Sequence, residues 1–420
     1  MSGHLNQTYL GNNHHLFELQ NGLRIIFTQR KKTMMVHCGI LIGSGSRDEN
    51  DENNGIAHFI EHAVFKGTKK RRSLQILNHL ESVGGELNAY TTRERTMYYT
   101  ASLKKYLGRS FEILTDIVFN PVFPENEIEK EKKVITEEIE MYEDSPEESI
   151  FDDFYKQLFR GNSLGYNILG TKDTITSFTK ETLVDFWSKN YTTGNMVISV
   201  AGNVSLDNVR KVIETYFLDR KSSQTEKKRI VPEVNTHFNI AETKDFQQVH
   251  CIIGNKAYSS YDKKRHALSV LNNILGGDWM SSRLNLSVRE KHAYAYNIQS
   301  SFNLYADSGT FTVQLGTDEK YLDKCIELIH KEFKKLKSVR LTSMQLNRCK
   351  RQIMSQYAMY HENTSAVIQI KGRNILDYGR IINEEEFFSH INQINADDVL
   401  SVANEVLDDN TLNMLIYKNE

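Results

Sequence analysis

The chain has 420 residues, of which 39% are hydrophobic and 25% charged, and its 52 basic and 54 acidic side chains leave a formal charge of −2. This length exceeds what one hydrophobic core usually supports, so the sequence predicts two domains. No global charge excess indicates nucleic-acid binding, and no stretch approaches the ~18 apolar residues of a membrane-spanning helix. The first 20 residues lack the basic residues and apolar run of a targeting signal, so we expect a cytoplasmic protein that binds neither nucleic acid nor membrane.

The four cysteines are isolated from one another in the sequence. Cys38, Cys251, Cys325 and Cys349 form no Cys-x-x-Cys pair, which indicates neither a disulfide framework nor a thiolate metal site. We expect reduced thiols that are mostly buried.

The first half of the chain opens with strand patterns and continues with helix patterns. Strands are predicted at 16–20 and 23–27 on either side of Asn21-Gly22, a dipeptide that favours a tight hairpin turn. A third strand at 34–42 leads through a glycine-rich loop into a helix. The remaining pattern predicts helices at 73–82, 105–118, 125–142, 178–190 and 205–217, with strands within 87–101 and at 195–202.

A polar run without periodicity separates the two halves. It predicts a first domain at 1–218, a linker at 219–235 and a second domain at 236–420. The pattern in the second half predicts a strand at 248–254, helices at 263–276 and 279–291, strands at 293–303 and 308–315, helices from 318 to 406 and a final strand.

The end of each half carries a similar apolar tetrapeptide. Asn195-Met-Val-Ile198 and Asn413-Met-Leu-Ile416 are 218 positions apart, close to half the chain length. This repeat favours duplication of one unit. The predicted fold is therefore α+β, with two similar domains, each a mainly antiparallel sheet with helices packed on it.

One short segment carries the strongest functional signal. In His58-Phe59-Ile60-Glu61-His62, the two histidines are four positions apart and lie on one helix face, so both can bind a single ion at 2.0–2.1 Å. Glu61 lies beside them and can act on a water molecule without replacing a histidine as ligand. The apolar neighbours argue against a solvated helix face and favour a buried metal ion.

A catalytic zinc usually has three protein ligands, so one more is needed. The predicted helix at 125–142 is the donor that we favour, because Glu131 and Glu138 are seven positions apart and share one face. Glu138 is the candidate ligand, and Glu131 is a candidate for orienting a ligand or the base. Glu137 stays an alternative, since one position turns a side chain by only about 100°.

Other polar groups receive no functional role. The remaining histidines lack ligand spacing, and the basic run from Lys66 to Arg72 is interpreted as a solvated loop. The second half has no His-x-x-Glu-His, because the residues offset by 218 from that motif fall in 276–280. One zinc ion per chain is expected.

Several motifs together resemble one peptidase family. The inverted zinc motif His-x-x-Glu-His is that of the inverzincins. Its surroundings are similar to the pitrilysin (insulinase-type) family of zinc peptidases, specifically the half-size branch that includes mitochondrial processing peptidase. The resemblance spans both halves and rests on the segments 43–49, 55–68, 84–91, 131–138, 282–284 and 289–296.

This resemblance implies a set of metal-site roles. His58, His62 and Glu138 would bind zinc, and Glu61 would be the general base. Glu131 would be the supporting carboxylate.

The resemblance also implies substrate-binding roles in both halves. Asn88, Ala89 and Tyr90 would lie on a strand to which the peptide adds as a further strand. Arg289 and Tyr296 match the family's arginine and tyrosine pair, which holds the substrate carbonyl and backbone.

The expected function is that of a zinc metalloendopeptidase that hydrolyses unfolded or short peptides, or removes a leader segment. Because the chain carries both the zinc motif and the arginine-tyrosine pair, a homodimer would be self-sufficient. A heterodimer with a related subunit is the second arrangement. The alternative function is that of a non-catalytic core or partner subunit with the same fold.

Overall fold

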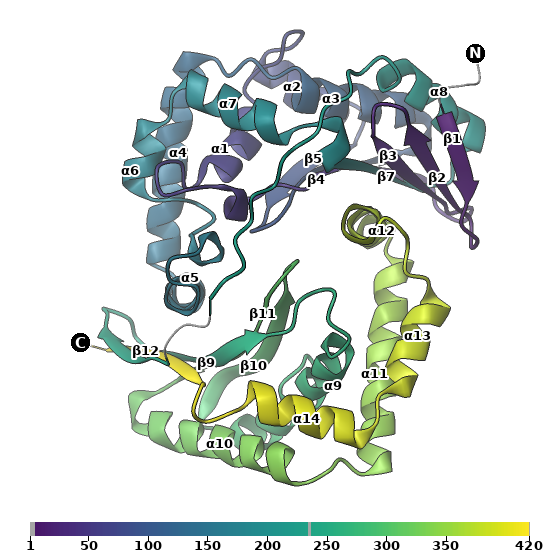
Figure 1. The fold of residues 1–420 in the computed structure, drawn as a ribbon. Helices are drawn as coiled ribbons and strands as arrows, with labels where there is room; N and C mark the ends of the chain where they lie inside the picture. Colours follow the sequence, from purple (N-terminus) through teal and green to yellow (C-terminus); the bar gives the residue numbers. More distant parts are fainter. Residues whose placement is uncertain (1–4, 234–236, 420) are drawn as a thin grey trace. The chain divides into compact units, whose positions relative to one another are not determined.

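The computed structural model describes residues 5–233 and 237–419. Positions 234 and 235 of the predicted linker, and position 236 at the predicted start of the second domain, lie outside these ranges. Two compact units form (Figure 1). Unit 1 comprises Met1–Ile139, Tyr166–Arg229 and Met359–Ile382, and unit 2 comprises Glu140–Gly165, Ile230–Ala358 and Asn383–Glu420.

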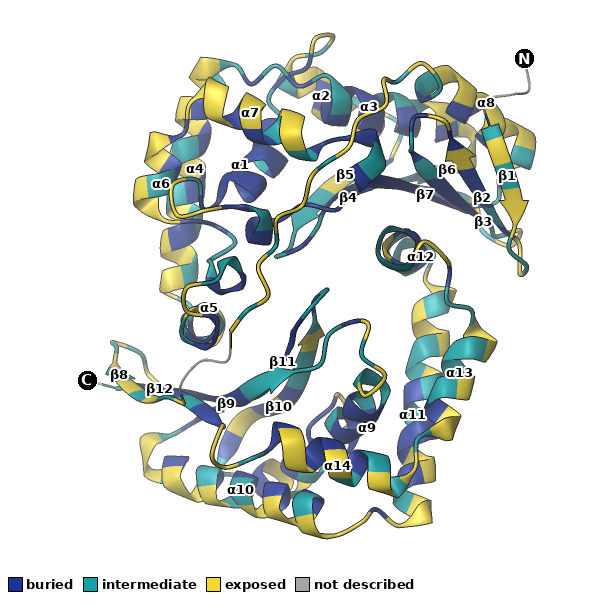
Figure 2. Cartoon of the chain, viewed as in Figure 1, coloured by how far each residue is buried: buried dark blue, intermediate teal, exposed yellow. Residues whose placement is uncertain are grey.

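Unit 1 contains a seven-stranded sheet in the order β1-β2-β3-β7-β4-β6-β5. All neighbouring strands are antiparallel except β3 and β7. Every residue of β7 is buried, as expected for a central strand covered on both faces (Figure 2). The strands are β1 Leu5–Tyr9, β2 His14–Leu19, β3 Arg24–Gln29, β4 Met35–Ile42, β5 Glu86–Thr91, β6 Thr96–Leu103 and β7 Met196–Gly202.

The helices of unit 1 confirm the predicted ones, whose ends agree to within two residues. The structure adds α6, which was not predicted, and α12 from the second half of the chain. The bounds are α1 Ile56–Ala63, α2 Ser73–Glu81, α3 Leu107–Phe119, α4 Glu125–Glu143, α6 Lys172–Ser177, α7 Lys180–Asn190, α8 Leu206–Tyr216 and α12 Thr364–Tyr378. The last residues of α4, from Glu140, are counted with unit 2.

Unit 2 contains a five-stranded sheet in the order β10-β11-β9-β12-β8. Strand β12 is parallel to β8 and antiparallel to β9, just as β7 is parallel to β3 and antiparallel to β4. The order β3-β7-β4-β6-β5 therefore recurs, which confirms the predicted pair of similar α+β domains. The strands are β8 Asn239–Thr243, β9 Val249–Ala257, β10 Ala295–Leu304, β11 Gly309–Thr317 and β12 Asn413–Lys418.

The helices of unit 2 follow the predicted pattern with two differences. Helix α5 was not predicted. The predicted helix at 279–291 is shorter and largely π-helical, spanning Asn285–Glu290. The α-helices are α5 Pro146–Leu158, α9 Arg265–Leu275, α10 Leu322–Ser338, α11 Ser343–Glu362, α13 Glu384–Gln393 and α14 Ala396–Val406. Among the described residues, no helix is long and apolar enough to cross a membrane.

Each sheet is covered by one helix from the other half of the chain. Helix α12 places Val367 and Ile368 against Leu41 of the first sheet, and α5 places Phe154 in a cluster with Ile252 of the second sheet. An apolar helix face packs wherever a matching apolar sheet face is available. The compact units therefore differ from the predicted contiguous domains, 1–218 and 236–420, by this exchange.

All four cysteines are free and buried, as predicted.

The histidine at the start of β2 gives unit 1 a specific sensitivity to acid. His14 is only 8% exposed, and its Nδ1 lies 2.8 Å from the Thr28 hydroxyl. Burial, with a smaller contribution from nearby positive groups led by Lys371, lowers the pKa of His14 from 6.5 to about 4. Between pH 6.5 and about pH 4, His14 is mostly protonated in the unfolded state but not in the folded state. The free energy of unfolding therefore decreases as the pH falls from 6.5 towards 4. Between pH 7 and pH 5 we expect a loss of about 2 kcal/mol.

Urea unfolding at the two pH values measures this loss. The fluorescence of Trp187, in a Trp279→Phe background, reports on unit 1. The variant His14→Gln should lose less stability between pH 7 and pH 5 by that amount, whereas His237→Gln, which alters an exposed histidine, should behave like the parent protein. An equal loss in His14→Gln and parent would show that His14 is not the group responsible.

Candidate metal centre

The start of α1 is fixed by a tight backbone turn and by a buried carboxylate. Gly55 precedes the helix at φ +93°, and a Cβ there would lie 2.6 Å from the carbonyl oxygen of Leu169. The Glu49 carboxylate accepts hydrogen bonds from the backbone N–H groups of Gly55 and Ala57 at 2.8 and 2.9 Å. A carboxylate at this position satisfies free N–H groups at the helix start. These contacts set the direction in which α1 presents its side chains.

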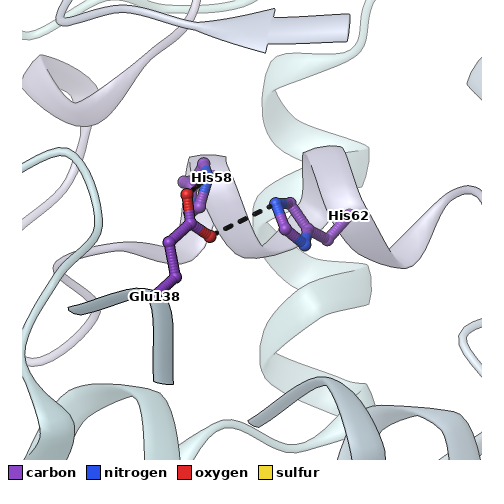
Figure 3. Close-up of side chains that lie close together, drawn as sticks. All are labelled: His58, His62 and Glu138. Carbon is purple, nitrogen blue, oxygen red and sulfur yellow. Dashed lines mark ion pairs between the residues drawn. The ribbon is translucent and has the colours of Figure 1, made fainter. Parts of the chain in front are cut away.

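Three side chains from α1 and α4 converge on one point (Figure 3). The Glu138 carboxylate lies 3.9 Å from His58 Nε2 and 3.7 Å from His62 Nε2. One donor atom from each residue falls within 4.8 Å of the others, and this is the one such group of three among the described residues. Glu137 is exposed and does not belong to this group.

The spacing and chemistry of these donors fit a zinc ion. Three donors that bind zinc at 2.0–2.1 Å lie about 3.3 Å apart, so these side chains need to shift by about 1 Å to bind the ion together. Burial, and then the charge of His62, lowers the pKa of His58 to about 3. A neutral imidazole is the form that binds a metal. Burial also raises the pKa of the Glu138 carboxyl, an effect that a bound dication would oppose.

A second carboxylate holds the ring of His62. Glu131 Oε1 lies 2.8 Å from His62 Nδ1, and its Oε2 accepts a hydrogen bond from Lys66 at 2.7 Å. Burial disfavours the charged form of both residues. The hydrogen bond and the charge of Glu131 nevertheless raise the pKa of His62. In turn, the hydrogen bonds and charges of His62 and Lys66 lower the pKa of Glu131. With Nδ1 occupied, Nε2 of His62 is the nitrogen available to a metal.

Glu61 lies beside the three donors but is held by a different partner. Its Oε2 accepts a 2.5 Å hydrogen bond from the Thr91 hydroxyl at the end of β5. Glu61 is only 9% exposed, and burial raises the pKa of its carboxyl despite this hydrogen bond. Sequence reasoning missed the Thr91 contact, because the two residues are 30 positions apart. The only signal was that Thr91 ends the segment thought to bind substrate.

Asn88, Ala89 and Tyr90 lie on β5, as predicted. Among residues 5–233 and 237–419, strand β5 is the last in its sheet and pairs only with β6. An edge strand presents unpaired backbone N–H and C=O groups to which another chain can add.

The predicted arginine and tyrosine pair lies in unit 2. Arg289 belongs to the π-helical turn, and its side chain is 46% exposed. Tyr296 lies on β10, is 60% exposed, and donates a 3.1 Å hydrogen bond to Asp318. Both side chains are accessible in unit 2, and their role stays a prediction.

Two family profiles match the residues that form this site and most of the rest of the chain. The profile described as "Insulinase (Peptidase family M16)" covers residues 24–172, which include the His-x-x-Glu-His segment and both acidic helix residues. The profile described as "Peptidase M16 inactive domain" covers residues 177–353. The chain belongs to peptidase family M16.

Relatives within family M16 extend over almost the full chain. An "uncharacterized zinc protease", YmxG of Bacillus subtilis, is 36% identical over 93% of this chain and 95% of its own length. The mitochondrial-processing peptidase subunit beta of Saccharomyces cerevisiae is 29% identical over 96% of this chain and 90% of its own length. A crystal structure of a protease from Helicobacter pylori has the same fold, with a TM-score of 0.88 at 23% identity over 96% of this chain and 99% of that one.

Proposed function

We propose that this M16 chain is a zinc-dependent endopeptidase with one zinc ion bound by His58, His62 and Glu138. The observation that carries the proposal is the convergence of those three donors beside Glu61, a buried carboxylate that is not itself among them. Homologues described as zinc proteases support the same chemistry. When bound, zinc would activate a water molecule and polarise the peptide carbonyl.

The protein groups would divide the remaining work. Glu61 would take the proton from the attacking water and deliver it to the leaving amine, since its raised pKa suits a group that both accepts and donates a proton. Thr91 would hold the Glu61 carboxylate in place through its hydrogen bond. Glu131 would hold the His62 ring so that Nε2 faces the metal.

Peptide binding would use the edge of the first sheet. A substrate segment adding to β5 would be recognised mainly through its backbone, which requires an extended segment and so favours unfolded or short peptides, including leader segments. Arg289 and Tyr296 are proposed to hold the substrate carbonyl and backbone. A homodimer, or a heterodimer with a related subunit, is the proposed assembly.

The non-catalytic alternative makes a different prediction about the site. A core or partner subunit would have no need for a complete donor set with a buried base beside it. All four groups are present here, which favours the peptidase.

Metal removal tests the proposal directly. The purified chain should hold about one zinc ion, lose peptide hydrolysis on treatment with a chelator and recover it when zinc is added back. Glu138→Gln should lower zinc occupancy and activity together, because a neutral amide replaces a charged ligand. Glu137→Gln is the matched control, since it makes the same change one position away on an exposed side chain. Zinc content is measured by elemental analysis and hydrolysis with a quenched peptide library.

Two results would contradict the proposal. Full zinc occupancy in Glu138→Gln would show that the ion binds elsewhere. A zinc-loaded wild-type chain that cleaves no peptide, alone or with a related subunit, would favour the non-catalytic role.

A further inference from the structure

The two faces of edge strand β5 meet different parts of unit 1. Thr91 points towards α1, where its hydroxyl reaches Glu61. Tyr90 points to the opposite face, where it packs against a cluster that includes Met97 of β6 and Ile368 of α12. Side chains alternate between the two faces of a sheet, so a peptide added to β5 would place every second side chain on the α12 face.

A cation without an ion-pair partner lies on that face. Arg373 of α12 is exposed and makes no ion pair or hydrogen bond with any residue in 5–233 or 237–419. Asp377, four positions further along the same helix face, is already bound by Arg95 through contacts of 2.6 and 3.3 Å. Arg373 and Arg95 therefore share the charge of Asp377, and only Arg95 contacts its carboxylate directly.

Tyr90 of β5 packs against the apolar cluster to which α12 contributes Val367 and Ile368, and this contact places α12 beside the strand. Burial raises the pKa of Tyr90, and the guanidinium groups of Arg373 and Arg95 partly offset that rise. Arg95 itself precedes β6 in the turn that follows β5, so the Arg95–Asp377 pair ties the end of α12 to the β5–β6 hairpin. Arg373 lies one helical turn before Asp377 on α12, on the part of the helix that this pair ties to the hairpin.

We propose that Arg373 binds an acidic side chain of a peptide added to β5, and so gives the peptidase a preference for glutamate or aspartate close to the cleaved bond. This inference rests on the proposed function. A guanidinium group forms strong paired hydrogen bonds with a carboxylate. The favoured acidic positions would be two residues apart, because only alternate side chains reach the α12 face. Acidic residues at the intervening positions would have no advantage.

Binding can be measured separately from cleavage. A fluorescent 12-residue neutral peptide carries one glutamate, moved through each position in turn, and a second series carries glutamine at the same positions. Dissociation constants are measured by anisotropy with zinc-loaded Glu61→Gln protein, in which peptides bind without being cut. Wild type then cleaves the same peptides, and mass spectrometry locates each cut.

Glutamate at the favoured positions should tighten binding by about 5- to 20-fold relative to glutamine. Arg373→Gln should bring this ratio to about 1, and Arg373→Glu should reverse it in favour of glutamine. Arg210→Gln, the same change at an exposed arginine of α8, should leave the ratio unchanged. Thermal unfolding of each variant shows whether it remains folded.

The outcomes separate the two proposals. A glutamate preference that survives Arg373→Gln, the lack of any preference, or the lack of any peptide binding would overturn the role of Arg373. A preference in binding that depends on Arg373, with no cleavage by wild type, would support the role of Arg373 and overturn the peptidase.

Discussion

Replacing Glu61 by glutamine is expected to lower kcat/KM for peptides by about 10³-fold while leaving the zinc content unchanged. The amide has the same shape as the carboxylate, and its oxygen can still accept the hydrogen bond from Thr91. It cannot accept a proton from water at neutral pH, so the step assigned to Glu61 fails. Zinc binding should persist, because Glu61 is not among the three converging donors.

The comparison requires zinc content and kinetics on the same preparation of each protein. Glu137→Gln controls for the loss of one carboxylate and should match wild type in both measurements. A fall in activity that tracks a loss of zinc would mean that Glu61 is a ligand. Full activity with full zinc would remove Glu61 from the mechanism.

Glu94→Ala is expected to destabilise unit 1 by about 3–5 kcal/mol, because it removes the carboxylate of a buried ion pair. Glu94 is 2% exposed and lies 2.7 Å from Arg47, whose side chain is fully buried. Arg229, from the segment predicted as a linker, contacts Glu94 at 3.2 Å and Asp48 at 2.8 Å. The alanine variant would therefore remove the carboxylate that Arg47 and Arg229 both contact.

Urea unfolding followed by Trp187 fluorescence in the Trp279→Phe background measures this cost. Asp185→Ala removes the acid of an exposed pair with Lys189 and should cost less than about 1 kcal/mol. If Glu94→Ala costs no more than Asp185→Ala, the buried pair contributes little to the folded state.

Local pattern was enough to predict most elements of the fold. Period-two and helical patterns located the strands and helices, because each depends on residues a few positions apart. The pairing of His58 and His62 could be predicted from the sequence in the same way, since residues four positions apart on a helix point in the same direction.

Contacts between segments that are distant in the chain could not be predicted from the sequence. The choice between Glu137 and Glu138 depends on how α4 is rotated against α1, and adjacent helix positions differ by only about 100°. Lys66 was interpreted as part of a solvated loop, but it binds Glu131, 65 positions away, at 2.7 Å. That interpretation was wrong for Lys66, because nothing in a short basic run shows which carboxylate lies opposite.

The exchange of α5 and α12 has a consequence for how the chain folds as it is synthesised. The first sheet is complete once β7, which ends at Gly202, has formed, but the helix that covers one face of it begins only at Thr364. During the intervening synthesis Leu41, Met97 and Ala201 have no native cover, so the first half carries an apolar surface prone to aggregation. Unit 1 therefore reaches its native state late, and a fragment that ends before residue 364 would depend on chaperones to remain in solution.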